Sequence, residues 1–258
     1  MTLNSINLTE FGLGEMLRCS LEIRRVAKRE PSMEAAGRRI SHFFYDELAT
    51  SDGARACALV RCYKTHAYGT LPRDLRRFAK RALQSTELPV TGLDSMRCLA
   101  LLATVGDEPS WNERHLSTGH QAIPLPSAQI VQRAPMISQL IHEFGLALSD
   151  VLQPSADVIR RLEGKTYGVF HVEEAAGSPY IPAQAQFVAR YGIRSVVGFG
   201  GSLPAGELFA VILFTRTVVS AATADRFRTL ALDVKGCLFP YGERNVFESP
   251  SSEVIAEN

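Results

Sequence analysis

The sequence contains no apolar run long enough to cross a bilayer and no strong excess of either charge. Its 258 residues carry 28 basic and 27 acidic side chains, giving a formal net charge of +1. A transmembrane helix needs about 20 consecutive apolar residues, and nucleic-acid-binding domains usually carry a clear basic surplus. The composition therefore argues against a membrane protein and against a nucleic-acid partner.

Cysteine is scarce and shows no pattern. The five cysteines are odd in number and lack the paired short spacings of a disulfide framework or a zinc site. The first ten residues, MTLNSINLTE, lack the basic and apolar regions of a signal peptide. We therefore expect free thiols and a cytoplasmic location.

The bulk of the chain has an ordinary globular composition, with 46% hydrophobic and 21% charged residues. It shows no internal repeat, low-complexity block or domain linker. These features predict a single domain over residues 1–240, made of an N-terminal helical pair (1–50) followed by a sheet with insertions (51–240). Residues 241–258 are predicted to form a polar tail.

Two apolar runs, at residues 193–199 and 207–215, flank the turn-forming segment GGSLPAG. This arrangement predicts a β-hairpin. Because both runs are almost wholly apolar, the hairpin is predicted to be buried on both faces, in the centre of a sheet. An apolar stripe at helical spacing follows, from Phe227 to Leu238, and ends before Pro240.

The remaining periodicity predicts helices at 13–29, 32–48, 71–83, 127–133, 136–148 and 155–162, and strands at 54–63, 96–105 and 167–172. In the first strand, alternation places Cys57, Leu59 and Tyr63 on one face and Ala58, Val60 and Cys62 on the other. The order predicts an α+β fold with an antiparallel central sheet flanked by helices, and with the N- and C-terminal helices packed together.

Three segments near the C-terminus resemble the second half of a GAF domain, a small-molecule-sensing fold of the PAS/GAF group. They are residues 191–196 (YGIRSV), 206–213 (GELFAVIL) and the helix at 227–238. Four segments also resemble the sensory region of some bacterial histidine kinases: 111–125, 134–141, 169–182 and 191–201. The resemblance implies a GAF-like sensory domain, and since no kinase motif follows, its output is expected to pass through a partner.

The long insertion after the strand at 96–105 concentrates aromatic, basic and imidazole groups. Long irregular segments inside compact domains are often functional. We therefore predict that this insertion covers one face of the sheet and lines a ligand pocket, with Arg114 binding an anionic group and His171 contributed by a strand. The predicted ligand-binding residues are Trp111, Asn112, Arg114, His115, His120, His171, Arg194 and Phe199.

Alternatives remain open for the same residues. Trp111 and Arg114 can simply anchor the loop, and His120 or His171 can be a hydrogen-bonded core residue or the ligand of a haem or metal ion. The second functional hypothesis is an enzyme that uses a Ser/His or Cys/His pair, such as a hydrolase. A plain interaction module is the third.

The sequence thus predicts a cytoplasmic sensory domain that binds a small ligand or cofactor, with haem as one candidate. It is expected to act in signal transduction through its terminal helices. Because the first helix has a broad apolar face, a homodimer formed by those helices is also predicted.

Overall fold

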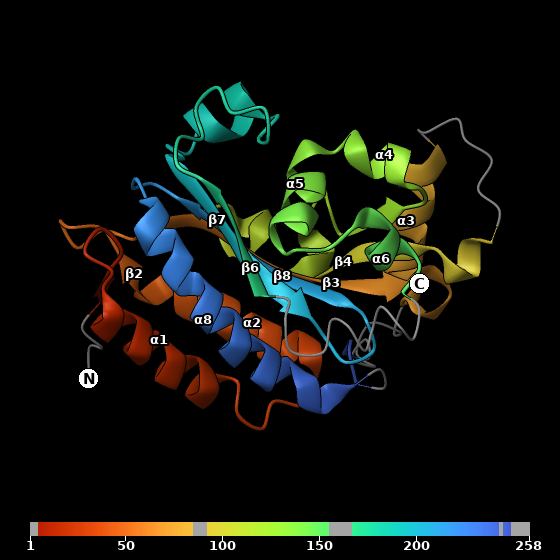
Figure 1. Cartoon of the computed structure of the whole chain (residues 1–258), viewed down its shortest axis with the longest axis horizontal. Helices are drawn as coiled ribbons and strands as arrows, with labels where there is room; N and C mark the ends of the chain where they lie inside the picture. The colour runs from red at the N-terminus through yellow and green to blue at the C-terminus, as the bar shows by residue number, and fades with distance from the viewer. Residues whose placement is uncertain (1–4, 85–91, 155–166, 243–244, 249–258) are drawn as a thin grey trace, which may run out of the picture.

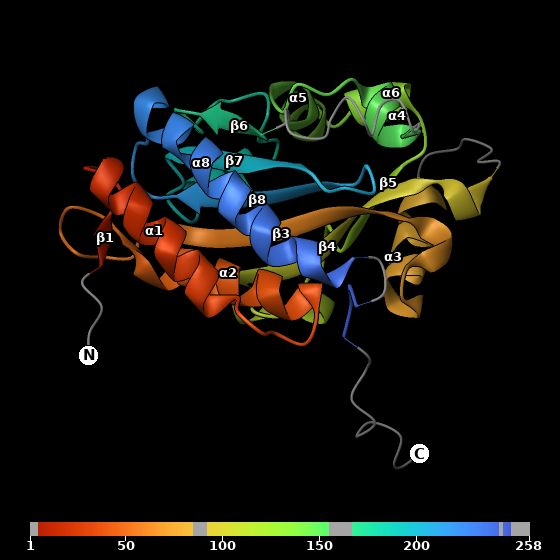
Figure 2. The ribbon, with the colours of Figure 1, turned by 60° about the horizontal axis from the view of Figure 1, so that its bottom comes forward.

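The computed structural model describes residues 5–84, 92–154, 167–242 and 245–248. Its centre is a six-stranded antiparallel sheet with the strand order β5-β4-β3-β8-β7-β6. In that order the strands are Ala122–Leu125, Arg97–Gly106, Cys57–Ala67, Leu208–Thr215, Ser195–Ser202 and Tyr167–Val172. Helices flank the sheet on both faces (Figures 1 and 2), so the predicted α+β class with an antiparallel central sheet is confirmed.

Two long helices, α2 (Met33–Glu47) and α8 (Ala221–Leu238), pack on one face of the sheet, and a third, α1 (Leu13–Val26), packs against both of them. The side chains of Ser32 and Ser220 cap α2 and α8 by accepting hydrogen bonds from backbone N–H groups in the first turn. The predicted packing of the terminal helices is also observed. Arg24 Nε of α1 donates to Asp233 Oδ1 of α8 at 2.7 Å.

Shorter helices cover the opposite face. They are α4 (Ala128–Gln132), α5 (Pro135–Glu143), α6 (Leu148–Leu152) and a π-helical segment, Gln184–Ala189. The two faces therefore carry two separate hydrophobic cores. The helix predicted at 155–162 lies outside the described residues. Within the described part of the chain, no helix combines the length and apolarity that crossing a membrane demands.

The central hairpin forms as predicted. β7 pairs with β8 over its whole length, from Ser195 opposite Thr215 to Ser202 opposite Leu208. Every residue of both strands is buried. Gly200 is required here, because a Cβ at this position would lie 2.1 Å from the carbonyl oxygen of Phe209.

The predicted alternation in β3 is wrong at its first two residues. Cys57 lies with Cys62 in the core beneath the long helices, whereas Ala58 lies with Leu59 and Tyr63 in the opposite core. The cause is a register shift against β8 between Cys57 and Leu59, because an extra residue in a strand exchanges the two faces. The two thiols five residues apart therefore share a face.

The long insertion contains more regular structure than the sequence predicts. Two 3₁₀ turns, Pro109–Trp111 and Arg114–Leu116, lead into strand β5, which pairs with β4. Pro124 lies inside β5, and the strand tolerates it because β5 is at the edge of the sheet. Helix α3 (Arg73–Gln84) packs beside β5 through Leu75, Ala79 and Leu83.

The segment at 245–248 lies over the N-terminus of α2. The amide nitrogens of Met33 and Glu34 donate to the carbonyl oxygens of Asn245 and Val246, each at 2.8 Å. Val246 is buried in the hydrophobic core beneath the long helices. These bonds satisfy N–H groups that the start of a helix otherwise leaves without partners.

Candidate functional site

A mostly apolar cavity of about 180 Å³ lies between the sheet and helix α5. Its floor comes from β3, β4 and β8, its rim from His120 and Ile123, and its roof from the start of α5 and the loop before the π-helical segment. The polar side chains among the lining residues are Arg61, Tyr63, His120 and Tyr180. A concave apolar site with a few polar groups is the usual form of a small-molecule site.

Arg61 is the central charged group of this cavity. It lies in β3 opposite Ile212 on one side and Thr104 on the other, so the sheet fixes its backbone. Its guanidinium donates from Nη1 to Tyr63 Oη at 3.2 Å and from Nη2 to Ser117 Oγ at 3.4 Å. Its Nε is buried and has no hydrogen-bond partner among the described residues.

His120 stands at the rim with a left-handed backbone conformation, φ 63°. Its surroundings exclude water from part of the ring, and this lowers the pKa of His120; the nearby Arg61 charge lowers it further. The residue as a whole still reaches solvent. A lowered pKa means that the imidazole is neutral near pH 7, where it can donate from one ring nitrogen and accept at the other.

The predicted residues Trp111 and Asn112 lie outside the cavity lining. The Trp111 ring packs against Tyr191 and Phe187, with centroid separations of 4.6 and 5.8 Å. Asn112 Oδ1 accepts a hydrogen bond from the backbone N–H of Gly106 at 3.0 Å. The Trp111 contacts tie the insertion to the π-helical segment and the residues after it, and the Asn112 bond ties it to the end of β4.

Arg114 and His115 point away from the cavity. Arg114 donates from Nε to Glu34 Oε1 at 3.0 Å and from Nη1 to Asp74 Oδ2 at 2.5 Å. Its guanidinium also lies 5.6 Å from the centre of the Phe247 ring. His115 is exposed beside Glu113, 2.9 Å away. The anion-binding role predicted for Arg114 is thus already filled by two carboxylates of the protein.

The other three predicted residues are also separate from the cavity. His171 alternates with the cavity-side residue Phe170, and its Nε2 lies 2.7 Å from the carbonyl oxygen of Val219. Phe199 is buried in the opposite core, against Phe44 and Phe227, and Arg194 is exposed. Of the eight predicted residues, the structure places only His120 in the lining.

The geometry also bears on the haem and metal alternative. His120 lines the cavity while His171 is held by a backbone carbonyl on the other face of the sheet, so the two cannot ligate one iron together. Across the described ranges, no three histidine, cysteine or carboxylate side chains are grouped as a metal site. Burial raises the pKa of Cys57, Cys62 and Cys98 to about 12, which leaves these thiols protonated and unreactive.

Arg61 is not among the predicted ligand-binding residues, although the sequence contains a signal for it. It is the single charged residue in the apolar run from Ala56 to Tyr63. A charge in the middle of a buried central strand is costly unless it is paired or functional. That argument selects Arg61 more directly than the cluster of polar residues in the insertion.

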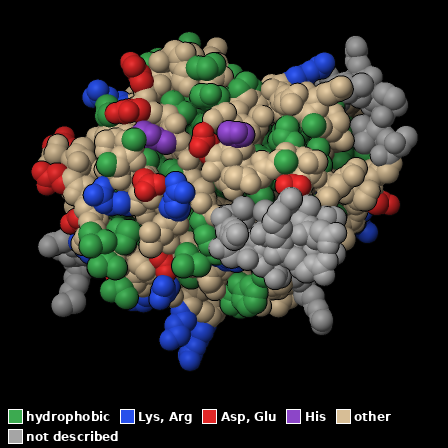
Figure 3. All heavy atoms as spheres, viewed as in Figure 1, with side chains coloured by type: hydrophobic (Ala, Val, Ile, Leu, Met, Phe, Trp, Pro, Cys, Tyr) green, Lys and Arg blue, Asp and Glu red, His purple; other side chains and the backbone are tan. Residues whose placement is uncertain are grey.

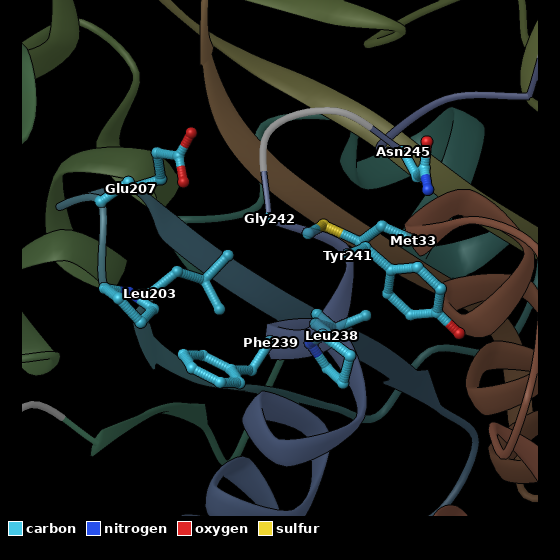
Figure 4. A pocket seen from close by; sticks show the side chains of 11 residues that line it. Met33, Leu203, Glu207, Leu238, Phe239, Tyr241, Gly242 and Asn245 are labelled. Carbon is cyan, nitrogen blue, oxygen red and sulfur yellow. The ribbon is translucent and has the colours of Figure 1, made fainter.

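A larger hollow of about 560 Å³ lies between the β7–β8 turn and the C-terminal end of α8 (Figure 4). Leu203, Leu238 and Phe239 form much of its wall. Its acidic side chain, Glu207, is already paired with the buried Lys64 Nζ at 2.6 Å. We therefore place the candidate site in the smaller cavity, because the buried Nε of its Arg61 has no hydrogen-bond partner in the described part of the chain.

Helix α3 has a strongly basic surface, although the formal net charge of the whole chain is only +1. Arg73, Arg77, Lys80 and Arg81 are exposed along one side of the helix, and its single acid, Asp74, is bound to Arg114. The balanced composition of the whole chain therefore excludes no anionic partner.

Comparison with known proteins finds no matching family model and no matching curated protein. A solved structure of the N-acylhomoserine lactone-dependent LuxR family transcription factor CepR2 from Burkholderia cenocepacia matches with 16% sequence identity and a TM-score of 0.37. The match covers 88% of this chain and 97% of that chain. The predicted membership of the GAF group is wrong: no family model matches the chain, and the solved structure that does match is of a LuxR family transcription factor.

Proposed function

We propose that this protein is a sensory domain that binds a small ligand with an apolar body and one anionic group in the cavity above β3 and β8. The observation that carries the proposal is Arg61, whose side chain lines a mostly apolar pocket and whose buried Nε has no hydrogen-bond partner among the described residues. A buried donor without a partner costs about 1–3 kcal/mol, and more when it is charged. A ligand acceptor removes that cost.

The charge of Arg61 sets the expected chemistry of the ligand. Among the described residues no carboxylate forms an ion pair with its guanidinium, in contrast to Arg114. A planar guanidinium binds a carboxylate with two parallel hydrogen bonds. The ligand is therefore expected to carry a carboxylate or a similar planar anionic group.

The rest of the cavity sets the size and the specificity. A cavity of about 150 Å³ in another protein accepts benzene, so about 180 Å³ suits a single ring or a short chain. Met136, Ile137 and Leu140 of α5 supply an apolar roof, and His120 and Tyr180 supply polar contacts at the edge.

Strand β8 connects the ligand cavity to the hydrophobic core beneath the long helices. Ile212 and Phe214 of β8 line the cavity, while the alternate residues Val211 and Leu213 lie in the core beneath α1, α2 and α8. A ligand that displaces β8 therefore changes the packing of both hydrophobic cores. This supports the expected output through the terminal helices to a partner.

The test is isothermal titration with phenylacetate and with its neutral isostere 2-phenylacetamide. The wild-type protein is expected to bind phenylacetate at least about tenfold more tightly than the amide, a difference of about 1.4 kcal/mol. Arg61→Gln is expected to abolish this preference, while the matched control Arg194→Gln, on an exposed arginine, keeps it. Equal binding of both compounds, or an unchanged preference in Arg61→Gln, contradicts the proposal.

The Ser/His form of the enzyme alternative gains no support from the geometry of Ser117, which lies three residues before His120. Ser117 Oγ donates to the carbonyl oxygen of Gly119 at 2.8 Å rather than to His120. We therefore propose no second function for this cavity.

A further inference from the structure

Helix α1 is apolar on both of its faces. Met16, Cys19 and Ile23 point inward and are buried. On the outer face, Leu13, Leu17 and Leu21 are 64%, 53% and 68% exposed. Figure 3 shows hydrophobic side chains gathered over this helix. Burying a leucine side chain stabilises a protein by about 1.5–3 kcal/mol, so three leucines left in water on one helix indicate a missing partner.

We propose that this face is an interface with a second copy of the same chain, in which the two α1 helices cross antiparallel on a twofold axis at Leu17. The three leucines follow each other at intervals of four residues, which places Leu13 and Leu21 about 6 Å to either side of Leu17. An antiparallel arrangement then sets Leu13 of each copy opposite Leu21 of the other. Such a self-complementary pattern is what a twofold interface requires.

Charge complementarity fixes the direction of the helices. Arg24 lies in the last turn of α1, and Glu10 lies in the segment just before the helix begins at Leu13. Both residues are exposed. Antiparallel helices bring the exposed Lys28 of one copy toward Glu10 of the other, together with Arg24, whose guanidinium is also bound to Asp233 of α8. Parallel helices instead set Arg24 against Arg24. The antiparallel alignment also places opposite ends of the helix dipoles together.

The size of the surface sets the expected affinity. Fourteen residues make α1 about 21 Å long, and the neighbouring α8 adds Leu232, which is 53% exposed. Such a surface lies at the small end of specific interfaces, so a dissociation constant in the micromolar range is expected. The inference is independent of the ligand proposed for the cavity.

Sedimentation velocity over about 1–200 µM protein tests the dimer, because this range brackets a micromolar constant. The wild type is expected to shift from monomer to dimer. Leu17→Asp is expected to weaken association at least about tenfold without changing the circular dichroism spectrum, since Leu17 is exposed. Glu10→Arg is expected to weaken it by a smaller factor that disappears at high salt.

Disulfide cross-linking tests the position of the axis. Packed helices lie about 8–10 Å apart, which brings facing Cα atoms within the roughly 4.4–6.8 Å range of a disulfide. Leu17→Cys is therefore expected to cross-link under mild oxidation. The controls are Ser149→Cys, at a position that is also exposed but lies on the opposite layer, and the wild type with its half-buried Cys237.

Three outcomes overturn the proposal. The first is a wild type that stays monomeric at the highest concentration. The second is Leu17→Cys cross-linking no faster than Ser149→Cys. The third is a monomer that instead binds vesicles of mixed phosphatidylcholine and phosphatidylglycerol in a Leu17-dependent way, which assigns the leucines to a lipid surface.

Discussion

Arg114 Nε donates a hydrogen bond to Glu34 Oε1 at 3.0 Å, and this bond joins two segments that are 80 residues apart in the chain. The same guanidinium binds Asp74 of α3 and lies against the Phe247 ring. Arg114 thus connects the insertion, two helices and the C-terminal segment. Its neighbouring carboxylates raise the pKa of Arg114 further, although burial alone acts in the opposite direction.

We predict that Arg114→Ala destabilises the fold by about 2–3 kcal/mol, because it removes both ion pairs and leaves the half-buried Glu34 carboxylate with one backbone hydrogen bond but without a counter-ion. Urea unfolding measures this change. The control is Arg133→Ala, on an exposed arginine. The affinity for phenylacetate is expected to change less than about twofold in either variant. A large loss of affinity in Arg114→Ala alone would instead indicate that the ligand binds at the insertion.

The buried ion pair between Lys64 and Glu207 leads to a second prediction. Lys64 is 0% exposed, and its Nζ lies 2.6 Å from Glu207 Oε1. Glu207→Ala is expected to cost about 3–5 kcal/mol, because it leaves a buried ammonium without its counter-ion. The double variant Lys64→Met, Glu207→Leu is expected to recover at least half of that loss. Glu174→Ala, at an exposed position, is the surface control in thermal melts.

Acid should destabilise the protein through His66. Burial, and then the nearby Lys64 charge, lower the pKa of His66 from 6.5 to about 4. Between these values the unfolded chain binds a proton that the folded chain does not, so stability is complete above pH 6.5 and falls as the pH drops. The shift corresponds to a loss of about 3 kcal/mol by pH 4.

Denaturant unfolding at pH 7, 6, 5 and 4 measures this effect. His66→Gln is expected to be less stable than the wild type at pH 7 but to lose less stability on acidification. His115→Gln, at an exposed histidine, is expected to follow the wild-type curve. A pH dependence that is the same in all three proteins rules out His66 as its source.

Gly200 and Gly119 offer a matched pair of substitutions. Alanine at Gly200 places a Cβ 2.1 Å from the Phe209 carbonyl oxygen, whereas alanine at Gly119 meets no atom within 4 Å. Gly200→Ala is therefore expected to cost about 3 kcal/mol or more through displacement of the paired strands, and Gly119→Ala less than about 0.5 kcal/mol. Thermal midpoints of the two variants compare these costs directly, and equal midpoints refute the close packing described for the hairpin.

The sequence by itself determined the order and the type of most elements. The hairpin, the capped helices α2 and α8 and strand β6 follow from apolar periodicity, turn residues and helix caps. These signals act within about 20 residues, through backbone hydrogen bonds and the burial of one face. For the same reason the antiparallel sheet and its two covered faces were predictable.

Only the tertiary structure decided which side chains meet. Arg61 and Arg114 carry the same side chain, yet one lines a cavity with no carboxylate among its described lining residues and the other binds two carboxylates. The difference arises because the insertion folds over the sheet edge and brings residues 34, 74 and 114 together. Likewise a single bulge in β3 exchanged the faces of Cys57 and Ala58. Such contacts depend on how distant segments pack, and no local pattern in the sequence encodes them.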